Sequence, residues 1–293
     1  MQEKEANQKM FGDLVSISKL LHIDHRVLIN QFCDINHWHM ETEIRFIIKA
    51  KGTISILDEE YQFKPGQLYI IPPFISHKIV LDHPNSPYER YNAYVDIPLC
   101  DMFLLPEDAK QFSELFLKFA FLQKYQFDIS DVQDQLLDLL NTLFHYQGCM
   151  KKTYQENKLI EFLIILYEIL KKEENNYPLD EQKFIFMKNV LNYVSENLSE
   201  ITVKMLAEHF QIRESELNKW FHNYAGCSTN QYIIHQKARK ASQLLRLGKS
   251  IKEVYQSVGY RDYSSLERAM KKSMKENLSY YKTYHPPYID ELQ

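Results

Sequence analysis

The spacing of hydrophobic and polar residues changes along this chain and divides it into segments. Up to about residue 100, short runs of β-branched and aromatic residues are separated by breaks, such as residues 51–52, 64–66 and 72–73. Such runs predict strands, and we place them at residues 27–32, 44–48, 53–57, 68–71, 78–81 and 91–97. Short strands at near-regular spacing are typical of an antiparallel β-barrel or jelly roll. A small barrel can enclose one small ligand.

Residues 106–176 follow a helical period instead. In the last part of this segment, hydrophobic residues recur at steps of three and four, at Leu159, Phe162, Leu163, Leu166, Ile169 and Leu170. A stripe of this kind packs against another element, and one interpretation is that these helices cover the open face of their own barrel. Residues 171–178 are charged and polar and end in Pro178, which predicts an interdomain linker.

Residues 201–226 contain two short amphipathic stretches separated by a polar break at residues 211–213. Their hydrophobic positions recur at helical spacing: Val203, Leu206, Ala207 and Phe210 in the first, and Leu217, Trp220 and Phe221 in the second. Gly226 is placed to end the second helix in a left-handed conformation. Two short helices joined by a tight turn predict a helix-turn-helix, whose second helix enters the major groove of DNA.

The same arrangement returns about fifty residues later, which we interpret as a duplication. The hydrophobic positions of the second unit are Ile251, Val254, Tyr255, Val258, Leu266, Ala269 and Met270, and Gly259 marks its turn. Residues 229–247 predict one connecting helix that ends at Gly248. Any helical bundle has amphipathic helices and turns, so two units in tandem on a spacer helix are a far more specific signal than one unit.

Residues 191–284 resemble the DNA-binding domain of the AraC/XylS family of bacterial transcription regulators. The resemblance is carried by LAEHF, by the L..WF....G ending of the first unit, by QKARKASQLL, and by I.EV..SVGY.D...L.R..KK. It implies that double-stranded promoter DNA is the partner, with RNA polymerase as a second partner if the protein is an activator. The DNA-binding residues that it implies are Ser215, Asn218, Lys219, Tyr263, Ser264, Ser265 and Arg268. The sequence departs from the family at Met270, Lys275 and Leu278, where Phe, Gly and Pro are usual.

The first segment carries a second resemblance. His37, His39 and Glu43 form an HxHxxxE motif, and His77 follows in GQLYIIPPFISH, which is similar to the two short motifs of the cupin barrel. Phe74 and Leu81 depart from those motifs, where Gly and often Asn stand.

AraC-family sensor domains are commonly cupins, so the two resemblances imply one architecture. They imply a small-molecule effector, with a sugar as one candidate, that is bound by His37, His39, Glu43, Tyr69 and His77. They also imply that the helices of residues 106–176 form a homodimer. Three imidazoles and a carboxylate would suit a divalent transition metal at His37, His39, Glu43 and His77. Because analogy of fold does not establish a metal, we expect a metal-free pocket and no cofactor.

Charge and composition agree with this interpretation. The formal net charge is −4, but the residues after Pro178 carry 17 Lys and Arg against 13 Asp and Glu, whereas the preceding residues sum to −8. A basic module joined to an acidic one suits a DNA-binding protein with an effector domain. The four cysteines form no CxxC pair, the first ten residues lack the apolar core of a signal peptide, and no stretch is long enough to span a membrane. We therefore expect a cytoplasmic protein.

Together these patterns predict an α+β multidomain protein. A cupin-like effector-binding barrel occupies residues 1–105, a helical dimerisation and linker segment residues 106–177, and an all-α DNA-binding domain with two helix-turn-helix units residues 178–293. The predicted function is a transcription regulator whose promoter binding responds to a small effector, and not an enzyme. The alternative is a metal-dependent cupin enzyme, a dioxygenase or isomerase, with a helical appendage.

Overall fold

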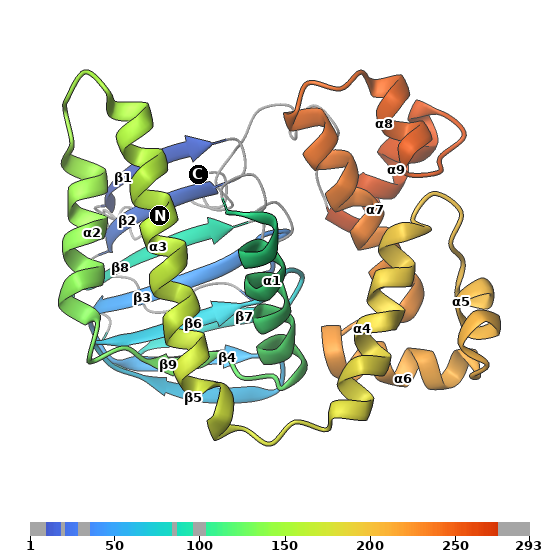
Figure 1. Ribbon diagram of the computed structural model, residues 1–293, viewed down its shortest axis with the longest axis horizontal. Coiled ribbons are helices and arrows are strands. Elements are labelled where there is room, and N and C mark those ends of the chain that lie inside the picture. Colours follow the sequence, from blue (N-terminus) through green and yellow to red (C-terminus); the bar gives the residue numbers. More distant parts are fainter. Residues whose placement is uncertain (1–9, 19–20, 29–35, 84–86, 96–103, 275–293) are drawn as a thin grey trace, which may run out of the picture. The chain divides into compact units, whose positions relative to one another are not determined.

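The computed structural model describes residues 10–18, 21–28, 36–83, 87–95 and 104–274 (Figure 1). The chain divides into two compact units, Met1–Pro178 and Leu179–Gln293. In the described residues the first unit combines strands and helices and the second is all helical, which confirms the predicted α+β class. No helix in this part of the chain has both the length and the apolar character needed to cross a membrane.

The first unit is built on two antiparallel sheets. The larger has the strand order β1-β2-β8-β3-β6-β9 and the smaller β5-β4-β7. Their bounds are β1 Met10–Ser18, β2 Leu21–Leu28, β3 Thr42–Lys49, β4 Gly52–Ile56, β5 Glu59–Phe63, β6 Gln67–Ile71, β7 His77–Leu81, β8 Tyr88–Val95 and β9 Gln126–Asp128. Side chains from both sheets share one hydrophobic cluster, which includes Ile47, Ile71, Ile54 and Ile79. The two sheets therefore enclose a common interior, as in the predicted barrel.

The opposite face of the larger sheet is covered by the helices α1 (Pro106–Phe121), α2 (Gln133–His145) and α3 (Lys151–Glu173) (Figure 1). This double covering explains why β3 is buried at six successive positions instead of at alternate ones, since successive side chains of a strand point to opposite faces. Ile44 and Phe46 pack against the helices, whereas Ile47 packs in the barrel interior.

The hydrophobic stripe of α3 lies inside this unit. All six of its residues are at most 6% exposed and belong to the cluster that joins the helices to the sheet. The stripe is therefore buried against the chain's own sheet, and dimerisation through the helices of residues 106–176 stays a prediction that would need another of their surfaces. Of the two roles considered for these helices, covering the barrel is the one that the stripe has.

Several elements were not predicted from the sequence, or were predicted with different bounds. β1, β5 and β9 were not predicted; β9 lies between α1 and α2 and joins the larger sheet, so the helical segment is not separate from the barrel. The predicted strand at residues 27–32 overlaps β2, which ends at Leu28, and residues 29–35 lie outside the described part of the chain. The predicted linker begins too early, because α3 continues to Glu173 and a 3-10 turn follows at Glu174–Asn176.

The second unit consists of α4 (Glu181–Glu196), α5 (Val203–Phe210), α6 (Glu214–Ala225), α7 (Thr229–Arg246), α8 (Ile251–Ser257) and α9 (Tyr263–Met274). The predicted turns have the expected backbone: Gln211, Gly226, Gly248 and Gly259 all have a positive φ. α7 packs against α6, α8 and α9. The long helix therefore connects the two helix-turn-helix units, α5–α6 and α8–α9, as the sequence predicted.

Candidate functional sites

The first helix-turn-helix is held by a small core of its own. Leu206 and Ala207 of α5 pack with Leu217 and Phe221 of α6 and with Ile233 of α7. Because these positions fix the buried side of α6, its opposite side faces solvent. The exposed side chains there include Ser215 and Lys219, two of the residues that the sequence assigned to DNA.

Asn218 has a structural contact in addition to its predicted role. Its Oδ1 accepts a hydrogen bond of 3.0 Å from the backbone N–H of Thr229, the first residue of α7. The first N–H groups of a helix lack partners within the helix, so Asn218 helps to fix the start of the connecting helix. This contact uses one lone pair of Oδ1 and leaves the side-chain N–H₂ group of Asn218 unused by it.

The second unit presents its polar residues on α9. Tyr263, Ser264 and Arg268 are exposed, and Ser265 is half-buried. The Tyr263 hydroxyl donates to Glu267 Oε1 at 2.8 Å, and Arg268 Nε–H donates to the carbonyl oxygen of Ser264 at 3.2 Å. The bond to Ser264 holds the Arg268 side chain along its own helix.

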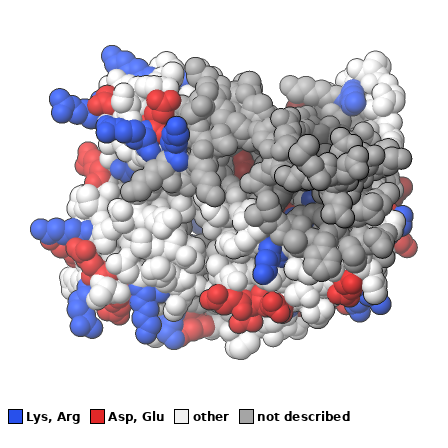
Figure 2. All heavy atoms as spheres, turned by 180° about the vertical axis from the view of Figure 1, so that it is seen from behind, with Lys and Arg blue, Asp and Glu red and all other residues white. Residues whose placement is uncertain are grey.

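The two exposed helix faces differ in charge. Glu214 and Glu216 flank Ser215 in the first turn of α6, whereas α9 carries Arg268 and Lys271 with Arg261 just before it. Lys and Arg are elsewhere interspersed with Asp and Glu, as on the described surface in Figure 2. Sequence analysis missed the acidic pair on α6, although it lies in the predicted reading helix. Of the three departures from the family, Met270 is fully buried, and Lys275 and Leu278 lie outside the described residues.

The histidines of the first unit are brought together by a short backbone contact. His37 and His77 form an isolated antiparallel bridge in which each backbone N–H donates to the other's carbonyl oxygen, at 3.0 and 2.9 Å. Phe74, which replaces the usual Gly, keeps a positive φ of 65° and donates its N–H to the carbonyl oxygen of His39 at 2.8 Å. These contacts fold the loop before β7 onto the loop before β3, which contains His39, and Glu43 follows on β3 itself.

Glu43 is the centre of this cluster. Its Oε2 lies 2.7 Å from His39 Nε2 and 3.2 Å from His77 Nε2, and its Oε1 accepts from Arg45 Nε at 2.6 Å. Burial by itself would raise the pKa of Glu43, but the Arg45 guanidinium and the hydrogen bonds to the two histidines hold the pKa well below its usual value. Burial also lowers the pKa of His77, against the opposing effect of Glu43. The carboxylate is therefore ionised in the buried cluster.

The donor set of the cluster fits a metal ion. One ligand atom from each of His37, His39, Glu43 and His77 can be chosen so that all four lie within 4.8 Å of one another. His39 Nδ1 lies 2.8 Å from the carbonyl oxygen of Glu41 and His77 Nδ1 lies 2.9 Å from that of Ile75. A carbonyl oxygen only accepts, so both Nδ1 atoms carry hydrogen and direct Nε2 to Glu43, an orientation frequent in metal-binding histidines.

Tyr69 does not join the four cluster residues. Its ring is fully buried, and its hydroxyl accepts from Gln126 of β9 at 2.8 Å. Tyr94 of β8 lies closer to the cluster, with its ring centroid 5.3 Å from that of His39. The sequence could not separate these two tyrosines, because both lie in strands and alternate with hydrophobic residues.

Comparisons with known proteins match both parts of the chain. The family model of the AraC-like ligand binding domain matches residues 28–157, and a helix-turn-helix domain model matches residues 206–283. The Msm operon regulatory protein of Streptococcus mutans serotype c is 23% identical over 236 residues, which cover 78% of this chain and 79% of that protein. The solved structure of ToxT from Vibrio cholerae is similar in fold, with a TM-score of 0.50 and 11% identity over 94% of this chain and 98% of ToxT.

The two matched regions have the order and content that the sequence motifs predicted. The chain therefore combines an AraC-like ligand binding domain with a helix-turn-helix domain, the arrangement of an AraC-type regulator. It is a transcription regulator with an N-terminal ligand-binding domain and a C-terminal DNA-binding domain of the helix-turn-helix type.

The ligand-binding domain of this AraC-type regulator also contains charged residues that the sequence interpretation overlooked. Asp24, Arg26, Arg45, Arg90 and Asn92 are at most 5% exposed. A partial signal was present, since these polar residues stand at alternate positions of their strands and hydrophobic residues occupy most of the positions between them, His25 being an exception. That pattern is usually given by a solvent-facing side, so it could not be distinguished from a polar barrel interior.

Proposed function

We propose that this protein binds promoter DNA through the exposed faces of α6 and α9 and that an effector in the barrel modulates this binding. The observation that carries the proposal is the presence of two helix-turn-helix units on one connecting helix, each with an exposed polar face. On α6 the proposed contacts are Ser215, Lys219 and the amide nitrogen of Asn218. On α9 they are Tyr263, Ser264, Ser265 and Arg268. A DNA-binding protein of this kind would act in the cytoplasm, with RNA polymerase as a partner if it activates transcription.

Genomic footprinting of the bound protein tests this proposal and would also identify the operator. Purified protein should then prefer the footprinted fragment to a scrambled duplex of the same composition, at a fixed salt concentration because phosphate contacts make affinity depend on salt. Equal affinity for both duplexes, with and without candidate effectors, would refute the proposed function.

The effector site that we propose is the barrel interior at His37, His39, Glu43 and His77. Its support is the convergence of these side chains from two separate loops and strands onto one buried point. An effector can change DNA binding only if its affinity differs between two states of the protein. The expected observation is therefore a change of promoter affinity on addition of the effector, which is lost in Glu43→Gln.

A metal-dependent enzyme is the second candidate, and the four-residue donor set is the observation that favours it. A divalent transition metal would be held by the imidazoles and by Glu43, where it would act as a Lewis acid. We favour the regulator because catalysis would leave both helix-turn-helix units without a role. Metal analysis of the purified protein, paired with promoter binding before and after chelation, distinguishes a catalytic metal from one that regulates DNA binding.

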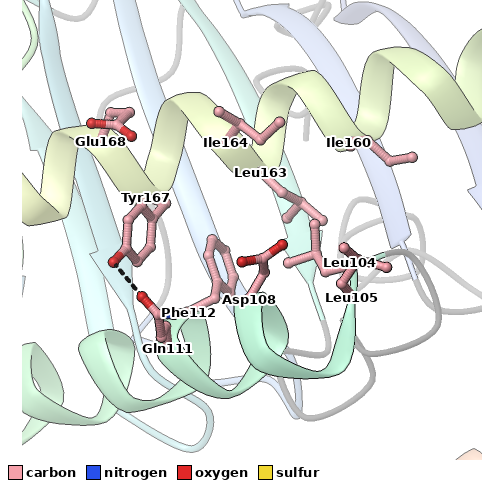
Figure 3. Close-up of a pocket in the computed structure, with 10 residues that line it drawn as sticks. All are labelled: Leu104, Leu105, Asp108, Gln111, Phe112, Ile160, Leu163, Ile164, Tyr167 and Glu168. Atoms are coloured by element: carbon pink, nitrogen blue, oxygen red, sulfur yellow. Dashed lines mark hydrogen bonds between the residues drawn. The ribbon is translucent and has the colours of Figure 1, made fainter.

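We also propose that the protein is a homodimer, through a groove between α1 and α3 to which the stripe contributes only Leu163. The groove has a volume of about 380 Å³ and is lined by hydrophobic side chains, among them Phe112, Leu163 and Ile164 (Figure 3). Ile164 and Leu105 remain 52% and 72% exposed beside it. One surface thus provides both a recess and projecting side chains, which a two-fold symmetric interface requires because both copies use the same patch.

Sedimentation analysis of Ile164→Glu tests this interface, because a charge buried in an apolar interface opposes association. Ile185→Glu is a matched control, since Ile185 on α4 is also 52% exposed. We expect Ile164→Glu to sediment as a monomer and Ile185→Glu to behave as the unmodified protein. If both variants remain dimeric, the dimer uses another surface.

A further inference from the structure

The residues between α3 and α4 are folded onto the first unit, although their composition predicted a linker. Tyr177 is half-buried and packs against the hydrophobic cluster that joins the helices to the larger sheet. Its ring meets that of Phe119 on α1 edge-on, with 6.3 Å between the centroids, and Lys124 Nζ lies 4.7 Å from its centroid. Glu174 pairs with Lys118 of α1 at 2.9 Å. These contacts, which we call the linker anchor, hold the end of the first unit against α1.

The connection that remains beyond the anchor is short. Two residues, Pro178 and Leu179, separate Tyr177 from Asp180, whose Oδ1 accepts from the backbone N–H of Lys183 and caps α4. An extended chain spans at most about 3.6 Å per residue, so the three steps from Tyr177 to Asp180 span at most about 11 Å. Release of the anchor back to the end of α3 would lengthen this tether to about 25 Å. The anchored and the released linker therefore allow the second unit different freedom of movement.

The same anchor contacts a segment that reaches the barrel interior. Residues 124–127 lead from α1 into the larger sheet, where β9 pairs with β6. Within this segment, Gln126 Nε2 donates to the hydroxyl of Tyr69, a residue of the interior cluster, at 2.8 Å. Phe127 meets the ring of Phe119 edge-on, with 5.2 Å between the centroids, and Phe119 is the ring that contacts the anchored tyrosine. Side chains in contact thus form a continuous series from the barrel interior to the linker, through which two sites can be coupled.

We propose that Tyr177 is a positioning residue for DNA binding: it fastens the linker to the ligand-binding domain, and release of its ring couples the barrel to the helices that bind the promoter. The inference rests on the proposed function, because it names the contact through which the effector would regulate DNA binding. An effector that favours either the anchored or the released state shifts the balance between them. The coupling is reciprocal, so promoter DNA that favours one of these states must also change the barrel.

Reciprocity makes promoter DNA a probe that requires no knowledge of the effector. The promoter fragment obtained by genomic footprinting is compared with a scrambled duplex of the same composition, each added at saturation to the full-length protein. Trp38 fluorescence in a Trp220→Phe background reports on the barrel, because the Trp38 ring lies 5.6 Å from that of Phe74 in the loop before β7. Hydrogen exchange of residues 171–177 reports on the linker anchor.

Four variants separate anchoring from general stability. Tyr177→Ala removes the anchored ring, and Lys124→Gln removes only the cation above it. Tyr177→Phe keeps the ring and should restore every signal that Tyr177→Ala loses. Tyr146→Ala is the matched control, because Tyr146 is also half-buried and its ring stacks on that of Tyr154, with 3.9 Å between the centroids.

Without DNA, we expect residues 171–177 to exchange about tenfold faster in Tyr177→Ala, because an aromatic pair and a cation–π contact together stabilise a folded segment by an energy of that order. Lys124→Gln should raise the rate by about threefold, and Tyr177→Phe and Tyr146→Ala should leave it unchanged. The promoter should change Trp38 emission more than the scrambled duplex does. Tyr177→Ala should lose this difference, whereas Tyr177→Phe and Tyr146→Ala should keep it. Lower stability alone would not remove a DNA-dependent signal from a variant that still binds the promoter.

The proposal is overturned if residues 171–177 exchange at the same rate in Tyr177→Ala and in the unmodified protein. It is also overturned if Trp38 does not respond to the promoter, or if its response survives in Tyr177→Ala. A chain that prefers no promoter fragment would refute the proposed function, and the exchange rates measured without DNA would still test the anchor. Promoter preference together with any of the contrary results would refute only the inference about Tyr177.

Discussion

At Gly259 a single added methyl group should strongly destabilise the DNA-binding unit. It follows α8 with a φ of +73°, and a Cβ added there would lie 1.6 Å from the carbonyl oxygen of Ser199 and 2.5 Å from its carbonyl carbon. These are backbone atoms of the loop between α4 and α5, so no side-chain rotation can relieve the overlap. Gly259→Ala must therefore push the second helix-turn-helix away from the first.

The expected loss of stability in Gly259→Ala has two contributions. A left-handed backbone costs an alanine about 1–2 kcal/mol, and overpacking against rigid neighbours costs about 1–3 kcal/mol more. Gly259→Ala should thus lower the free energy of unfolding of this unit by about 4 kcal/mol, a large share of the roughly 5–15 kcal/mol that stabilises a domain. Gly248→Ala separates the two parts, because Gly248 has a φ of +83° but an added Cβ would meet nothing within 4 Å. It should cost only about 1 kcal/mol.

The assay is urea unfolding of the full-length protein, followed through Trp220 in a Trp38→Phe background so that the signal comes from the second unit. Promoter affinity of each folded variant is measured in parallel. We expect Gly259→Ala to unfold at a much lower urea concentration than Gly248→Ala and to bind its promoter more weakly. Equal midpoints for the two variants would refute the argument that contact with Ser199 decides the effect.

Three further predictions concern the same unit. Arg268→Ala should weaken promoter binding by about 1–3 kcal/mol if Arg268 contacts a base. If Arg268 contacts only a phosphate, the variant should instead reduce by about one the slope of log binding constant against log salt concentration. Titrations at several salt concentrations distinguish these two outcomes. Asn218→Ala should cost about 1 kcal/mol of stability, because the start of α7 loses a bond that resembles a helix cap; an unchanged urea midpoint would contradict this. Burial lowers the pKa of His235 from 6.5 to about 4, so the unfolded chain binds the proton more tightly. Stability should be complete above pH 6.5 and fall by about 3 kcal/mol toward pH 4, and urea midpoints of His235→Leu should not follow that fall.

Secondary structure could be predicted from the sequence wherever the spacing of hydrophobic residues matches the period of the element that forms. In the second unit, each helix buries one stripe and each turn needs one special residue, so Leu206, Leu217, Gly226 and Gly259 could be assigned from spacing alone. Five of the predicted strands, β3, β4, β6, β7 and β8, were found in the same way. β5 was missed because its exposed, charged positions resemble a loop, and β9 because three residues between two helices give no period to recognise.

Contacts between distant residues could not be predicted from any such pattern. Local patterns were enough to identify the two-part organisation, the tandem helix-turn-helix units and the motif that contains His37, His39, Glu43 and His77. The folded structure was needed to show that the hydrophobic stripe of α3 is buried on the sheet, and that Arg26 opposes Arg90. The physical reason is that periodicity shows which side of an element is buried, whereas the partner that buries it depends on strand register and packing between residues far apart in the chain.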